Sequence, residues 1–137
     1  MKIENLFVKK SDKLIIHDLS IDFSPRNIHV IMGPNGSGKT TLSYTIVGHP
    51  DCIVESGKIN YNGKSLLDMD ITQRSLEGIF LAPQYPSVID GLSHAAFLKE
   101  AVNSKRAYQG LDDLDEFDFL SILKEKASEF KFSPKDY

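Results

Sequence analysis

The sequence predicts an α/β fold in which an antiparallel β layer leads into a partial parallel core, followed by a helical region. Residues 33–40 read Gly-Pro-Asn-Gly-Ser-Gly-Lys-Thr and fit the phosphate-binding loop pattern G-x-x-x-x-G-K-[ST]. An apolar run over 28–32 reaches the loop, and a helix-forming run begins at its end. Strand, glycine loop and helix in this order are the setting that the motif requires.

Two short antiparallel strands are expected ahead of the loop. Apolar residues alternate loosely across 3–8 and again across 14–23, and residues 24–27 read as a turn. Ile28–Met32 is apolar on both faces and is therefore predicted to be a buried strand.

Shorter elements are expected beyond the loop. A helix over 40–47 is followed by a strand over 57–61, which an Asn-Gly turn closes. A helix over 71–77 and a buried strand over 79–81 come next. Two prolines then block both helix and central strand.

The last third is predicted to be helical. Ser93 caps a helix over 94–108, and a second helix covers 114–130. Acidic residues crowd the start of the second helix, which suits its dipole, and are interpreted as a solvated face. Its apolar residues share one stripe: Phe117, Leu120, Leu123 and Ala127.

The chemistry of the loop is that of a phosphate site. Its glycines let successive backbone N–H groups point into one concavity, and the following helix adds the positive end of its dipole. Lys39 can reach the β- and γ-phosphates, and the Thr40 hydroxyl can ligate Mg²⁺. The competing interpretation is a glycine-rich turn with an incidental lysine.

Composition excludes several classes of protein. The net charge of −3 gives no basic footprint for nucleic acid, and no apolar run approaches the length of a membrane span. The N-terminus does not resemble a signal peptide. The single cysteine, Cys52, is read as a small packed side chain, and a reducing cytoplasm is the expected location.

The loop and a later glutamine together point to a family. Gln84 stands alone at the end of the apolar run 79–81, and the chain resembles ABC-type ATPases. The closer resemblance is to the soluble ABC-type ATPase of the Suf iron–sulfur cluster assembly system. It is carried by Gly48-His49-Pro50, by the segment Gly78–Pro86 and by Gly91-Leu92-Ser93.

The resemblance implies roles for single residues. Lys39 and Gln84 take the catalytic roles, and Thr40 and Gln84 serve Mg²⁺. In many ABC ATPases an aromatic residue stacks on adenine; the position here is about Lys10, so the adenine contact is left unassigned. ATP is held by the loop residues, which are Gly33, Pro34, Asn35, Gly36, Ser37, Gly38, Lys39, Thr40 and Thr41.

Partners and domains also follow from the resemblance. A soluble Suf-type scaffold protein is expected to bind at about Tyr85–Phe97. A second ATPase copy is expected to associate with the chain when nucleotide binds. Residues 1–92 are interpreted as a partial nucleotide-binding core, and 93–137 as the beginning of a helical subdomain that stops before the signature motif.

Several family motifs do not occur in the sequence. It has no L-S-G-G-Q-like signature, no run of four apolar residues ending in Asp-Glu, and no late strand-end histidine. Hydrolysis by this chain alone is therefore doubtful, and the unpaired strand over 28–32 is expected to leave the chain marginally stable or self-associating. The alternatives are the ATP-binding subunit of an ABC transporter, a non-catalytic nucleotide- or partner-binding module, and a small P-loop phosphotransferase.

Overall fold

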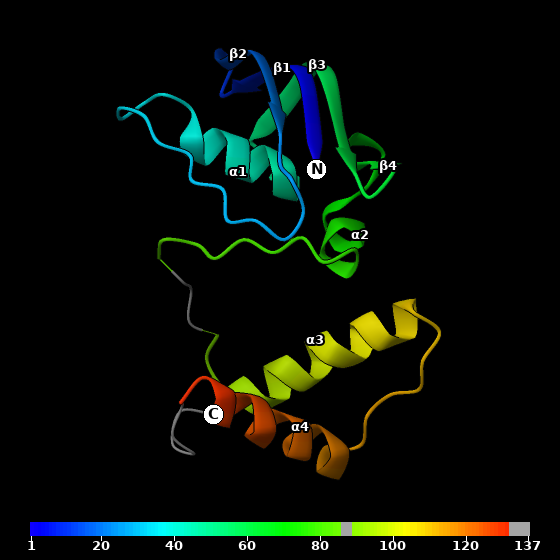
Figure 1. Ribbon diagram of the computed structural model, residues 1–137. Coiled ribbons are helices and arrows are strands. Elements are labelled where there is room, and N and C mark those ends of the chain that lie inside the picture. Colours follow the sequence, from blue (N-terminus) through cyan, green and yellow to red (C-terminus); the bar gives the residue numbers. More distant parts are fainter. Residues whose placement is uncertain (86–88, 132–137) are drawn as a thin grey trace. The chain divides into compact units, whose positions relative to one another are not determined.

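The chain divides into two units, Met1–Ala82 and Pro83–Tyr137. The computed structural model describes residues 1–85 and 89–131 (Figure 1). The division falls earlier than the expected boundary between residues 92 and 93, so the loop that carries Gln84 is grouped with the helices that follow it. The assignment of the two parts to a nucleotide core and a helical subdomain stays a prediction.

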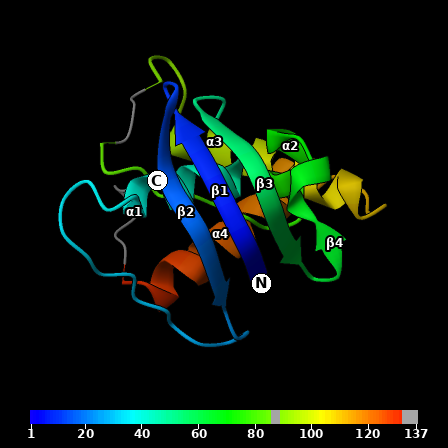
Figure 2. The ribbon, with the colours of Figure 1, turned by 90° about the horizontal axis from the view of Figure 1, so that it is seen from above.

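A four-stranded antiparallel sheet forms the first unit (Figure 2). Its strands run in the order β2-β1-β3-β4, and two-residue turns connect β1 to β2 and β3 to β4. Both turn residues have positive φ in each case, 48° and 63° at Ser11 and Asp12, and 50° and 80° at Asn62 and Gly63. This is the turn geometry that matches the twist of paired strands. The strands are β1 (Lys2–Lys10), β2 (Lys13–Asp22), β3 (Cys52–Tyr61) and β4 (Lys64–Ser65).

The helix predicted over 40–47 is confirmed as α1 (Lys39–Val47), and it packs against this sheet. Leu42 of α1 is buried with apolar side chains of the strands. Leu6 and Val8 alternate along β1, and an irregularity between Ile3 and Leu6, where Asn5 has a φ of 47°, brings Ile3 to the same side. Leu66 of the short 3₁₀ helix η1 (Leu66–Asp68) joins them. The core consists of Ile3, Leu6, Val8, Ile16, Leu42, Ile59 and Leu66.

A short helix, α2 (Ile71–Leu76), follows η1 and confirms the helix predicted over 71–77. The Asp70 carboxylate accepts a hydrogen bond from the Gln73 N–H at 2.7 Å, and the Gln73 side chain accepts one from the Asp70 N–H at 2.9 Å. This reciprocal capping box satisfies two N–H groups that would otherwise lack partners.

The second unit contains the two predicted helices, α3 (His94–Tyr108) and α4 (Glu116–Glu129). Ser93 caps α3 by accepting from the Ala96 N–H at 3.2 Å, and Asp115 caps α4 by accepting from the Asp118 N–H at 2.8 Å. The predicted apolar stripe needs one correction. Phe117 is 79% exposed, and Phe119 is buried instead, since the helix turns that face inward.

The two buried strands predicted at 28–32 and 79–81 are wrong. Neither segment has regular structure, and Ile28, Val30 and Phe80 are 96%, 74% and 86% exposed. A strand needs hydrogen-bonding neighbours, and among residues 1–85 and 89–131 the four strands pair only with one another. The α/β class is confirmed, but the sheet of the described chain is antiparallel throughout, without the expected parallel core.

Candidate functional site

The phosphate loop, residues 33–40, leads directly into α1. Gly36 and Gly38 have φ of 82° and 92°, a left-handed backbone that glycine adopts without strain. The Ser37 N–H donates to the Pro34 carbonyl at 3.3 Å and the Leu42 N–H donates to the Gly38 carbonyl at 2.8 Å. These bonds curl the chain, so that the exposed loop opens at the helix start.

The N-terminus of α1 is open to an anion. Within the described chain no side chain caps Gly38, and no acidic residue stands in the first turn. The first N–H groups of a helix have no partner inside the helix, and they lie at the positive end of its dipole. Thr40, in this first turn, is exposed. The local structure therefore offers donors and a hydroxyl with room for a phosphate group.

Lys39 is folded back over the loop. Its ammonium group donates to the carbonyl oxygens of Gly33 and Pro34, each at 2.8 Å. The side chain is half-buried, and both acceptors belong to the loop itself. The positive charge is thus held at the concavity that the loop encloses, where a phosphate oxygen can replace one carbonyl as its acceptor.

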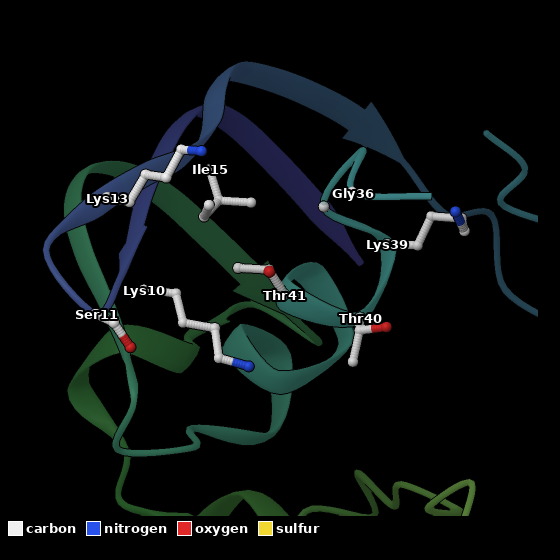
Figure 3. Close-up of a pocket in the computed structure, with 9 residues that line it drawn as sticks. Lys10, Ser11, Lys13, Ile15, Gly36, Lys39, Thr40 and Thr41 are labelled. Atoms are coloured by element: carbon white, nitrogen blue, oxygen red, sulfur yellow. The ribbon is translucent and has the colours of Figure 1, made fainter. Parts of the chain in front are cut away.

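A cavity of about 430 Å³ opens beside the loop. Figure 3 shows Lys10 and Lys13 on one side of it and Gly36, Lys39 and Thr40 on the other. Three lysines and no carboxylate are among the lining residues, which favours an anionic ligand. The volume lies within the ordinary range for small-molecule sites. The lining consists of Lys10, Ser11, Lys13, Ile15, Gly36, Gly38, Lys39, Thr40 and Thr41.

The remaining loop residues lie around a second hollow of about 450 Å³. Gly33, Pro34 and Ser37 line it, together with apolar side chains that include Ile31 and Leu42. Asn35 is an exposed residue of the same loop and lies outside both linings. Eight of the nine predicted loop residues thus line one or both of the two cavities, and Asn35 lines neither.

Gln84 lies just beyond the division of the chain, in the second unit, and is exposed. Its predicted role toward Mg²⁺ therefore stays a prediction. The expected partner surface, Tyr85–Phe97, begins in the same loop; its residues 86–88 lie outside the described residues. Of its described residues, Tyr85 is 84% exposed and Phe97 is 52% exposed.

The donor set for a metal is limited. Among the described residues, no cluster of three or more His, Cys, Asp or Glu side chains could hold a metal ion. A Mg²⁺ ion at the loop would accordingly bind the Thr40 hydroxyl, water and the phosphates of a nucleotide, which are the oxygen ligands it prefers. In the same part of the chain, no helix combines the length and the apolar character needed to span a membrane.

Four lining residues were not among the predicted sites: Lys10, Ser11, Lys13 and Ile15. They belong to the hairpin of β1 and β2, in which Lys10 pairs with Lys13 across the two-residue turn. In the sequence, only the resemblance indicated Lys10, as about the position where many ABC ATPases carry an aromatic residue that stacks on adenine. No local pattern predicted that this hairpin would lie beside the phosphate loop.

Comparisons with known proteins bear on the whole chain. A family model described as ABC transporter matches residues 16–133. The chain is 45% identical over 136 residues to "Probable ATP-dependent transporter SufC" of Escherichia coli, covering 99% of this chain and 54% of that protein. It is 42% identical over 134 residues to "Probable ATP-dependent transporter slr0075" of Synechocystis sp., covering 98% and 52%.

A third relative is more distant. The chain is 35% identical over 136 residues to "Vegetative protein 296" of Bacillus subtilis, covering 99% of this chain and 50% of that protein. The chain therefore spans about half the length of the curated relatives it matches.

Proposed function

Because the chain belongs to the ABC transporter family, we propose that it supplies the ATP-binding loop of an ABC-type ATPase that acts in iron–sulfur cluster assembly. The observation that carries the proposal is the uncapped N-terminus of α1 beside a cavity that three lysines line. An ATP triphosphate is stabilised by N–H donors and positive charge, so these features support the proposal.

The loop residues have separate roles in this proposal. The backbone of Asn35 to Thr41 holds the phosphates, and Lys39 neutralises charge on the β- and γ-phosphates by leaving one of its loop carbonyls. The Thr40 hydroxyl binds Mg²⁺. The resemblance to the family gives the Gln84 amide its role, which is to approach Mg²⁺ or the attacking water. The ion itself supplies Lewis-acid stabilisation of phosphate charge.

The proposed partners are a soluble Suf-type scaffold, which meets about Tyr85–Phe97, and a second ATPase copy. The similarity to the protein named SufC supports the scaffold, and the exposed aromatic rings of Tyr85 and Phe97 are suited to a protein contact. A cytoplasmic location is part of the same proposal.

A transporter subunit is the second candidate. The printed names of two relatives, which call them ATP-dependent transporters, favour it. Its partner would be a membrane permease. Co-purification of the chain with a soluble scaffold supports the first candidate, and co-purification with a permease supports the second.

Isothermal titration of the 137-residue chain with ATP and Mg²⁺ tests the nucleotide site. Lys39→Ala should abolish binding, whereas Lys58→Ala, which removes a charge from β3 outside both cavities, should not. We expect no steady phosphate release from this chain alone, because the sequence carries no Asp-Glu pair that ends an apolar strand. A folded chain that binds no ATP would overturn the proposal.

A further inference from the structure

The ammonium group of Lys10 lies over the ring of Tyr44, 5.0 Å from its centroid. Lys10 is the last residue of β1, and Tyr44 lies in the middle of α1. The face of an aromatic ring attracts a cation at this distance. The contact therefore joins the hairpin on one side of the cavity to the helix that follows the phosphate loop.

The Tyr44 ring also contacts the ring of His49. The two rings are stacked, with centroids 4.7 Å apart and planes inclined by 15°. The end of α1 explains why they meet. The Gly48 N–H donates to the Thr45 carbonyl at 3.2 Å, and the His49 N–H donates to the Tyr44 carbonyl at 2.9 Å.

This bonding pattern is a Schellman motif, in which the residue after the left-handed glycine contacts a side chain one turn back. The way in which α1 ends thus explains why the His49 ring stacks on the Tyr44 ring. It does not explain why the Lys10 ammonium group contacts the Tyr44 ring, because Lys10 belongs to β1 and its side chain is partly exposed to solvent.

Lys10 lines the cavity, whereas Tyr44 does not. Figure 3 shows Lys10 on the side opposite Gly36, Lys39 and Thr40. A nucleotide whose phosphates lie on the loop would extend its nucleoside toward Lys10, Lys13 and Ile15. With its ammonium group on Tyr44, Lys10 leaves its methylene chain to face this part of the ligand.

We propose that Tyr44, seated on His49, is a positioning residue of the nucleotide site, which holds Lys10 against the nucleoside part of ATP. The inference rests on the proposed function, since it requires ATP to occupy the cavity. Tyr44 itself does not touch the nucleotide. Because Tyr44 already holds the Lys10 side chain in one conformation, Lys10 loses less conformational entropy when ATP binds.

The test compares ATP with inorganic tripolyphosphate, which fills only the phosphate loop, each titrated with Mg²⁺ into the full chain. Tyr44→Leu removes the ring, and we expect ATP binding to weaken about two- to fivefold. Binding of tripolyphosphate should not change. Tyr44→Phe keeps the ring and should bind ATP as the unaltered chain does.

Lys10→Met, which keeps an apolar side chain but removes the anchoring charge, should give a similar loss. The double variant should lose no more than either single variant, because both remove one contact. Lys58→Met is the matched control for loss of a positive charge, and it lies outside the cavity. Lys10→Met also provides the test if Tyr44→Leu fails to fold.

The outcomes separate the two proposals. If the unaltered chain binds neither ligand, the proposed function fails and this inference fails with it. If it binds both, and a folded Tyr44→Leu or Lys10→Met chain retains full ATP affinity, only the inference fails. Additive losses would also overturn it, because they mean that Tyr44 and Lys10 act independently. Equal losses for ATP and tripolyphosphate would overturn it as well, because they mean that the nucleoside part of ATP is not involved.

Discussion

The guanidinium group of Arg74 donates a hydrogen bond to the carbonyl oxygen of Thr45, 2.8 Å away, at the C-terminal end of α1. It also donates to the carbonyl oxygens of Ile46 at 3.1 Å and Met69 at 3.0 Å. The last carbonyls of a helix lack partners within it and lie at the negative end of its dipole. Arg74 thus ties α2 to the helix that carries the phosphate loop.

Replacing Arg74 should destabilise this unit. Arg74→Lys keeps the charge but loses the planar fork that reaches several carbonyls at once, so these carbonyl oxygens lose hydrogen bonds. We expect the free energy of unfolding to fall by about 1–3 kcal/mol in urea titrations. Arg26→Lys makes the same change at an exposed arginine and should have little effect. An equal loss in both variants would contradict this role.

The pH dependence of that loss follows from the ionisation of Arg74. Burial lowers the pKa of the guanidinium, because desolvation disfavours the charged form. A base whose pKa is lowered by folding costs stability at lower pH, and this cost falls only as the pH rises through the folded-state pKa toward the unfolded one. Arginine is effectively always protonated in proteins, so the loss in Arg74→Lys should be the same at about pH 6 and about pH 8.

Gly38 should be needed for both stability and binding. Its φ is 92°, and a Cβ placed there would lie 3.4 Å from Cγ2 of Ile15. The contact itself is ordinary, but Gly38→Ala strains the left-handed backbone, and we expect a loss of about 1–2 kcal/mol together with weaker ATP binding. Gly110→Ala has a similar φ, 72°, in open space and should leave ATP affinity unchanged. Calorimetry that finds equal ATP affinity in both variants would count against the loop geometry.

Helices were predictable where their signals are local. The helix over 94–108 was predicted with its cap, Ser93, because cap and helical spacing lie within a few residues. The strand over 28–32 was not predictable in the same way. Its apolar pattern was visible, but a strand exists only with neighbours, and no described segment supplies them.

In the candidate site, too, features with a local sequence signal could be predicted and contacts between distant segments could not. The loop and the family could be predicted, and the family match confirms the resemblance, because the motif is continuous in sequence. The cavity wall could not. Lys10 and Tyr44 meet only because the hairpin and α1 pack together, and no local pattern encodes that contact.

Asn103 should hold the connection between α3 and α4. Its side-chain N–H donates to the Leu114 carbonyl at 3.2 Å, and its carbonyl oxygen accepts from the Leu114 N–H at 2.9 Å. Asn103→Asp removes the donor and places a carboxylate against a carbonyl, which should lower the free energy of unfolding by about 1–3 kcal/mol. The loss should shrink below about pH 4, because a protonated carboxyl regains an O–H donor.

Hydrogen exchange at the Leu114 amide measures this effect locally, in the connection itself. Asn27→Asp introduces the same change at an exposed asparagine and should leave exchange at Leu114 unaltered. A pH-independent loss in Asn103→Asp would show that the donor is not what matters.

The segment Ile28–Met32 should drive self-association of the chain. Its apolar side chains are exposed to solvent: Ile28, Val30 and Met32 are 96%, 74% and 86% exposed. An exposed segment with apolar side chains and backbone groups that no neighbouring strand pairs can form hydrogen bonds with the same segment of another chain. The double change Ile28→Thr with Val30→Thr should therefore weaken association in sedimentation velocity. The same double change at Ile53 and Ile71, which are 55% and 53% exposed, should not. An unaltered chain that sediments as a monomer at every concentration would refute the prediction.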